Sequence, residues 1–103
     1  MDNAAGSLDI SQLALTHNQD ESRFEAAIGE ERALVEYELR DGVYAITETF
    51  TPPAFRGYGV AAKLTQFALD TIRAEGGRVL PVCPYAITYI ERHPQVQDLL
   101  AGE

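Results

Sequence analysis

Residues 51–61 of the chain read TPPAFRGYGVA, and the sequence changes its pattern as it passes through them. Before this stretch, apolar and polar residues alternate with a period of two, which is typical of strands. After it, apolar residues recur at helical spacing, starting at Val60. Pro52 and Pro53 end the strand pattern, because neither can donate a hydrogen bond to a sheet. The stretch is therefore predicted to be a loop that joins a strand to a helix.

Four strands are predicted on the N-terminal side of this loop. In the second of them, Phe24 and Ile28 share one face while Arg23 and Glu25 point outward. The dipeptide Asp41-Gly42 favours a tight hairpin, since both residue types tolerate positive φ. Four strands joined by short turns predict an antiparallel meander. The predicted strands are Gln12–His17, Ser22–Ile28, Ala33–Arg40 (with Leu39 facing inward) and Val43–Thr51.

A helix, a fifth strand and a second helix are predicted on the C-terminal side. Pro81 indicates that the fifth strand is an edge strand or contains a bulge. A strand–helix–strand unit requires a parallel, right-handed crossover. The fold class is therefore α+β (mixed α/β), with helices packed on a mixed sheet. The predicted segments are a helix from Val60 to Gly76-Gly77, a strand over Arg78–Cys83, a helix from Pro84 to His93, and one or two turns over Gln95–Leu100.

Length and charge restrict the kinds of partner. The chain has 103 residues, enough for one domain, which we place at residues 12–103 after a flexible segment at 1–11. A net charge of −8 makes nucleic acid and membrane surfaces unfavourable partners.

The one cysteine, Cys83, excludes an internal disulfide and favours a reducing compartment, the cytoplasm. His17, His93 and Cys83 have no metal-like spacing, so we expect no metal site. A monomer or small homo-oligomer is expected.

The loop at residues 56–61 has the features of an anion site. Gly57 and Gly59 leave room for a ligand to approach the backbone. The first N–H groups of the following helix have no partner within that helix, and Arg56 adds a cation beside them. Phosphate is the typical ligand of such a site. The alternative is a loop that merely needs positive φ and binds nothing.

Within this loop the chain resembles the GNAT-superfamily N-acetyltransferases. Arg56, Gly59 and Ala61 fill the three defining positions of the motif Arg/Gln-x-x-Gly-x-Gly/Ala. The resemblance extends over about residues 12–100 and is greatest to a small subgroup of roughly domain-only length. The further matching segments are His17-Asn18, Ser22-Arg23-Phe24-Glu25, Thr49, Pro52-Pro53, Pro81-x-Cys83, Tyr89 and Glu91-Arg92-His93-Pro94.

The resemblance implies acetyl-CoA binding in a cleft between splayed fourth and fifth strands. The loop amides would hold the pyrophosphate and the pantetheine arm would run beside the fourth strand. A backbone N–H of the fourth strand would polarise the thioester carbonyl. The cofactor-binding residues implied are Phe50, Thr51, Arg56, Gly57, Tyr58, Gly59, Val60 and Ala61.

Three residues are candidates for the chemistry, each with a structural alternative. Glu48 would be the base if it is buried beside the thioester; otherwise it is an outward sheet carboxylate. Members of the subgroup often carry His at this position, so Glu48 departs from the pattern. Tyr89 resembles the tyrosine that protonates the leaving sulfur, but it also suits a core. Cys83 is either a covalent acyl acceptor or a small buried residue.

The leading functional hypothesis is a CoA-dependent enzyme that moves acetyl from acetyl-CoA to an amine. A cationic amine would suit the acidic surface. One alternative is a CoA-binding or regulatory module without turnover, and another is an interaction domain whose loop binds nothing. Larger members of the superfamily continue with two further strands that help to form the acceptor pocket. We therefore expect an open acceptor side, or one closed by a partner subunit.

Overall fold

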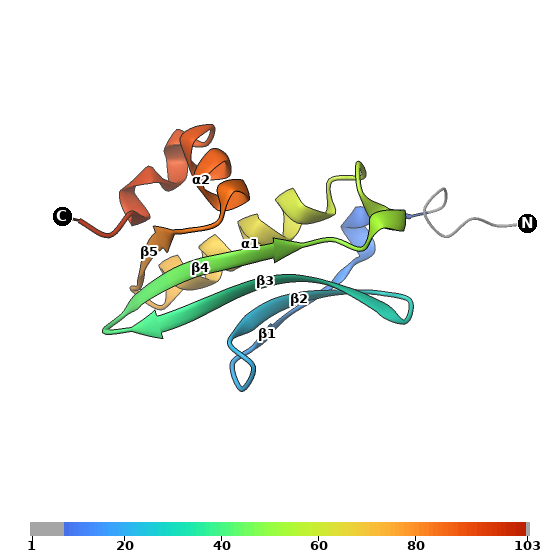
Figure 1. Cartoon of the computed structure of the whole chain (residues 1–103), viewed down its shortest axis with the longest axis horizontal. Coiled ribbons are helices and arrows are strands. Elements are labelled where there is room, and N and C mark those ends of the chain that lie inside the picture. The colour runs from blue at the N-terminus through green and yellow to red at the C-terminus, as the bar shows by residue number, and fades with distance from the viewer. Residues whose placement is uncertain (1–7, 103) are drawn as a thin grey trace, which may run out of the picture.

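A five-stranded mixed sheet forms the framework of the computed structural model, which describes residues 8–102 (Figure 1). The strands lie in sequence order across the sheet. Neighbours among the first four pair antiparallel, and the last two pair parallel. The predicted meander and crossover are thereby confirmed. The strands are β1 Ala14–Asn18, β2 Arg23–Ile28, β3 Glu31–Arg40, β4 Val43–Phe50 and β5 Arg78–Pro81.

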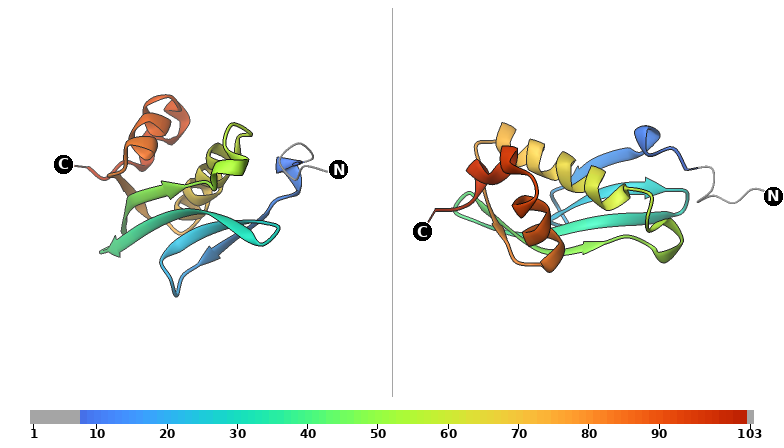
Figure 2. Two further views of the ribbon diagram at one scale, coloured as in Figure 1. Left: turned by 45° about the vertical axis from the view of Figure 1, so that its right-hand side comes forward. Right: turned by 90° about the horizontal axis from the view of Figure 1, so that it is seen from above.

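Two α-helices lie on one face of this sheet, and among residues 8–102 the other face carries no helix (Figure 2). Helix α1 spans Val60–Ala74 and connects β4 to β5, while α2 spans Pro84–Glu91. Glycines end α1 as predicted, because the N–H of Gly77 donates to the carbonyl of Ile72. No helix within residues 8–102 is long and apolar enough to cross a bilayer. Short 3-10 turns occur at Ile10–Gln12, Pro53–Phe55 and Pro94–Leu99.

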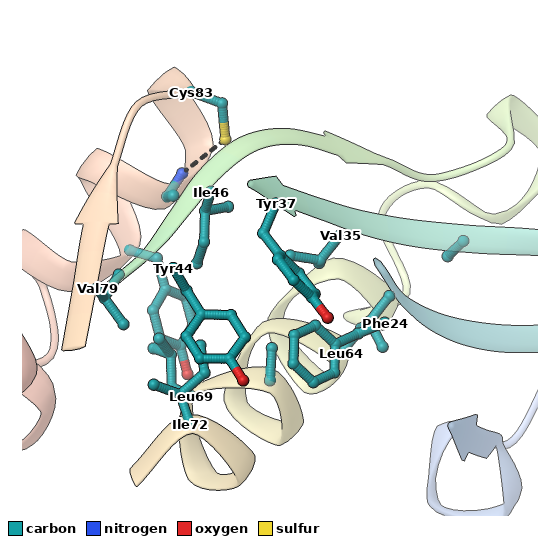
Figure 3. Packing of buried hydrophobic residues seen from close by; sticks show 14 of the residues in the cluster. Phe24, Val35, Tyr37, Tyr44, Ile46, Leu64, Leu69, Ile72, Val79 and Cys83 are labelled. Atoms are coloured by element: carbon teal, nitrogen blue, oxygen red, sulfur yellow. Dashed lines mark hydrogen bonds between the residues drawn. The ribbon is translucent and has the colours of Figure 1, made fainter. Parts of the chain in front are cut away.

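The core lies between the sheet and α1 (Figure 3). Alternate residues of the strands, such as Phe24, Val35 and Ile46, point toward α1 and are almost fully buried. From the helix, Leu64 and Ile72 meet them. This single apolar layer fixes which side chains of β4 face α1 and which face the uncovered side of the sheet.

The observed strand boundaries differ from those predicted by up to two residues, and two of these differences follow from a local hydrogen-bond pattern. The first strand begins at Ala14, since the Asp9 carboxylate accepts the Ser11 N–H at 3.0 Å and turns the preceding residues. The fifth strand ends at Pro81, since the N–H groups of Val82 and Cys83 both donate to the carbonyl of Ile46. Residues 1–7 of the predicted flexible segment lie outside the described residues.

A β-bulge interrupts the pairing of β3 with β4. Tyr37 pairs with Ile46, but Glu36 pairs with Glu48, so Thr47 is an extra residue on β4. The bulge shifts the alternation of β4 by one residue. Ile46 faces α1, Glu48 faces the uncovered side, and Thr49 faces α1 again. Leu39, predicted to be inward, is exposed, because the end of β3 runs past β2, whose pairing begins at Arg23 opposite Glu36.

Glu25 is buried rather than directed into solvent as predicted. Its carboxylate accepts hydrogen bonds from Arg23 Nε at 2.7 Å, Asn18 Nδ2 at 2.9 Å and Arg32 Nη1 at 3.3 Å. These long polar side chains cover it on the uncovered face of the sheet. The hydrogen bonds from Arg23 and then Asn18 hold the pKa of Glu25 below its ordinary value of 4.5, against the effect of burial.

We expect Glu25→Gln to lower the free energy of unfolding at pH 7 by about 1–2 kcal/mol, since two partly exposed arginines lose their charged acceptor. Because folding lowers the pKa, this stabilisation is present above about pH 4.5 and is lost as the pH falls through the lower folded value. Urea unfolding of both proteins at pH 7 and below pH 4 checks this. A difference that stays constant with pH would contradict the assignment.

Candidate active site

A pocket of about 390 Å³ lies where β4 ends, α1 begins and α2 makes its first turn. The strand end and the helix start are joined by the loop that the sequence singled out, at the right-hand end of β4 in Figure 1. The pocket is open to solvent on one side, as a site for a long ligand must be. Its lining residues are Thr49, Phe50, Thr51, Phe55, Arg56, Gly57, Gly59, Val60, Ala61, Ala62 and Tyr85.

The loop that borders this pocket carries a row of unpaired backbone donors. Gly57 and Gly59 both have φ of 87°, a left-handed conformation that side chains disfavour. Gly59 is the N-cap of α1 and has no side chain to satisfy the first turn. The six N–H groups of residues 57–62 donate to no acceptor within residues 8–102. Free amides at a helix N-terminus favour an anion.

Arg56 is held at the edge of the same pocket. Its Nε donates to the carbonyl oxygen of Thr51 at 2.8 Å, and its guanidinium lies 6.0 Å from the centre of the Phe50 ring. Within residues 8–102 neither Nη atom has an acceptor. The side chain is thus anchored through one nitrogen, and its two terminal nitrogens can bind a ligand oxygen.

Beside the pocket, β4 continues beyond the end of β5. The last paired residues are Ile46 and Pro81, so Thr47–Phe50 have no partner on the β5 side within the described chain. The chain turns away at Val82 and Cys83, whose amides both bond to Ile46. The divergence matches the splayed strands that the resemblance implied, and it leaves backbone groups of β4 free to bind an extended ligand.

Cys83 lies next to the pocket without lining it. It is buried, it is the N-cap of α2, and its Sγ accepts the N–H of Ala86 at 3.4 Å (Figure 3). Thr49, which does line the pocket, has its Oγ1 3.4 Å from the same sulfur. The β4 bulge is what turns Thr49 to this side of the sheet.

Glu48 lies away from the pocket. It is exposed on the uncovered face, directly across from Glu36, because the bulge reverses the alternation after Ile46. The burial that the base hypothesis required is absent. A direct role as base inside this pocket therefore has no support from its position.

The two tyrosines of α2 occupy different surroundings. Tyr89 is buried and stacks on His93 with ring centres 3.9 Å apart, and it does not line the pocket. Tyr85, one turn earlier, lines the pocket opposite the loop. Burial first, and then the neighbouring Tyr89, raise the pKa of Tyr85, so its phenol holds its proton at neutral pH. Burial, and then Asp70, raise the pKa of Tyr89.

The structure thus brings together all the predicted cofactor residues except Tyr58, whose side chain does not line the pocket. Thr49, Phe55, Ala62 and Tyr85 line it and were not among the predicted site residues. Tyr85 had one sequence signal: it follows Cys83-Pro84, so it belongs to the first turn of the helix that leaves the fifth strand. Within residues 8–102, no group of three His, Cys, Asp or Glu residues is placed to hold a metal ion.

Comparison with known proteins agrees with this geometry. A family model described as GCN5-related N-acetyl-transferase matches residues 23–99, a span that contains the whole pocket. The fold is similar to the solution NMR structure of a GCN5-like protein from Staphylococcus aureus, a proposed N-acetyltransferase. The TM-score is 0.65 over 90% of this chain and 92% of that chain, at 21% sequence identity. The predicted fold class is confirmed, and the chain belongs to the family of GCN5-related N-acetyltransferases.

Proposed function

We propose that the protein is an acetyl-CoA-dependent N-acetyltransferase that acetylates an amine. The observation that carries the proposal is the row of six unpaired amides, residues 57–62, beside Arg56 in an open pocket. Family membership supports the reaction class. A cytoplasmic location is proposed as well, on the basis of the single cysteine.

Each part of the pocket fits one part of acetyl-CoA. The amides of residues 57–62 and the Arg56 guanidinium suit the pyrophosphate, which needs donors from several sides. The unpaired edge of β4 at Thr49–Thr51 suits the amide groups of the pantetheine arm, which can bond to a free strand edge. Thr49 and Tyr85 would then lie at the thioester end.

Acetyl-CoA, when bound, supplies an acetyl group whose carbonyl carbon an amine attacks, with formation of a C–N bond and loss of the C–S bond. The Tyr85 phenol is the proton donor for the departing sulfur, because it lines the pocket and keeps its proton at neutral pH. A free N–H of β4 beyond Ile46 polarises the carbonyl as an oxyanion donor. The amine loses one proton when the amide product forms, which completes the reaction.

The acceptor is proposed to be a cationic amine that approaches from the uncovered face. Glu36 and Glu48 lie directly opposite each other there. Arg23 Nη1 lies 3.9 Å from the Glu36 carboxylate, whereas Glu48 has no ion-pair partner within residues 8–102, so Glu48 is the carboxylate left for a cationic group. In this position Glu48 would attract the ammonium group or accept its proton through water. Cys83 stays a predicted acyl acceptor, with its sulfur within 3.4 Å of Thr49.

A second candidate function is a CoA-binding module without turnover. The observation in its favour is that, in the part of the chain that the structure describes, no His, Asp or Glu lines the pocket to act directly as a general base. Both functions require acetyl-CoA binding. An assay of free CoA release over a panel of amines distinguishes them, because the module binds acetyl-CoA and releases none.

We expect Arg56→Ala to weaken acetyl-CoA binding by about 10- to 150-fold, the cost of losing charge-assisted hydrogen bonds worth about 1.5–3 kcal/mol. Isothermal titration calorimetry measures the dissociation constant directly. Arg92→Ala is the matched control, because it removes the same charge from an exposed position at the far end of α2. An equal loss of affinity in both variants would mean that net charge, and not this pocket, governs binding.

A further inference from the structure

The uncovered face of the sheet carries an apolar hollow at the β3–β4 hairpin, about 270 Å³ in volume. Its floor is Val43, Ala45 and Leu80, which alternate with residues that face α1. Leu80 is 49% exposed, although it is an apolar residue on a strand. The hollow is separate from the acetyl-CoA pocket, since the two share no lining residue.

One acidic and one basic residue border this floor. Glu38 and Arg40 lie two residues apart on β3, so they point to the same face. Neither forms an ion pair or a side-chain hydrogen bond within residues 8–102. Unpaired charges of opposite sign beside an exposed apolar floor are typical of the rim of a protein interface.

Under two-fold symmetry, Glu38 and Arg40 of one copy can pair with Arg40 and Glu38 of a second copy. A second copy can pack on this face through a two-fold rotation axis. The axis lies in the plane of the interface and crosses β3 at a right angle at residue 39. Glu38 and Arg40 lie at equal distances from that axis, so Glu38 of each copy faces Arg40 of the other. The same operation places Ala45 over Val43, because Ala45 is in register with Glu38 and Val43 with Arg40. Small side chains at the centre permit close sheet packing.

We propose that the uncovered face at Glu38, Arg40, Val43, Ala45 and Leu80 is the interface of a homodimer. The patch is small, so the dimer belongs to the weak and reversible class that buries less than about 1,200 Å² in total. The partner on this face is a second copy of the chain, because the two-fold places Glu38 of each copy against Arg40 of the other. Glu36 and Glu48, where the acceptor is proposed to approach, lie on this face but are not part of the patch. The thioester end of the acetyl-CoA pocket, at Thr49, lies on the other face.

Sedimentation equilibrium from micromolar to millimolar protein tests the proposed homodimer. Physiological salt is used because the Debye length is then about 8 Å, which screens the repulsion between two negatively charged copies. We expect a concentration-dependent dimer. Leu80→Arg should raise its dissociation constant at least tenfold, because the same two-fold places residue 80 opposite Arg78 of the other copy, which is in register with Val43. The matched control is Leu39→Arg, because Leu39 is 50% exposed where Leu80 is 49% exposed, and it lies on the opposite face of the same hairpin. Monomer at every concentration would overturn the proposal.

Charge reversal tests the symmetry itself. Glu38→Arg alone places two like charges in contact, as does Arg40→Glu alone, so each should raise the dissociation constant about tenfold or more. The double variant restores opposite charges on both sides of the axis and should return the dissociation constant to near that of the unmodified protein. Restoration is specific to self-association. A double variant no better than the single ones, with melting temperatures unchanged, would overturn the two-fold pairing.

Discussion

Gly59→Val is expected to abolish binding of acetyl-CoA while leaving a folded protein. Gly59 has φ of 87°, where a β-branched residue is strained, and the added side chain drives the backbone toward negative φ. That rotation turns the N–H groups of the first helical turn away from the pocket. A Cβ would also meet Ile10 Cδ1 at 3.3 Å. The strain lowers the free energy of unfolding by about 1–3 kcal/mol.

Thermal unfolding with and without acetyl-CoA measures both effects. At a concentration of 100 times its dissociation constant the ligand stabilises the unmodified protein by about 2.7 kcal/mol, which raises the melting temperature by about 11–22 °C in a domain of this size. Gly29→Val is the matched control, because Gly29 also has positive φ, 62°, but lies in the turn between β2 and β3. It should lose similar stability and keep the full ligand shift. A ligand shift retained in Gly59→Val would refute the role of the loop amides.

Tyr85→Phe is expected to lower the rate of acetyl transfer by about 10²–10⁴-fold, the usual contribution of a positioned acid. The change removes only the phenol oxygen and leaves the ring that lines the pocket. Acetyl-CoA affinity should therefore change little. Because the raised pKa of Tyr85 keeps the phenol protonated, the variant should also lose the fall in rate at alkaline pH that deprotonation causes. Steady-state CoA release across pH measures both.

Tyr89→Phe is the control that distinguishes the two tyrosines of α2. Tyr89 stacks on His93, away from the pocket, so its hydroxyl should be dispensable for the rate. If Tyr89→Phe is slow and Tyr85→Phe is active, the acid is the residue that the family resemblance indicated. If neither variant is slower, no tyrosine of α2 donates the proton.

Much of the fold was predictable because its signals are local. Period-two alternation identified the meander, and paired prolines followed by Arg56-Gly57-Tyr58-Gly59 identified the loop. Glycine at a left-handed N-cap is a property of the residue itself, so Gly59 could be assigned to the anion site before its neighbours were known. The cofactor half of the pocket consists of this contiguous segment.

The remaining features depend on contacts between distant segments. No sequence pattern predicts the extra residue at Thr47. This bulge nevertheless turns Glu48 to one face of the sheet and Thr49 to the other. Glu25 follows the outward alternation, but Asn18 and Arg32, from both neighbouring strands, cover it. The choice between Tyr85 and Tyr89 depends on how α2 packs beside β4 and the loop. Sequence periodicity places both on one helix and does not decide between them.

The amides of residues 57–62 are proposed to bind the pyrophosphate of acetyl-CoA. A titration of the protein with acetyl-CoA, followed residue by residue in two-dimensional amide NMR spectra, tests it most directly. We expect the resonances of Gly57 to Ala62 to show the largest shifts, to saturate together, and to respond in the same way to ADP, which carries an adenosine-linked diphosphate but lacks the pantetheine arm. Absence of shifts in this segment at millimolar acetyl-CoA, or saturating shifts confined to other residues, would contradict pyrophosphate binding by these amides.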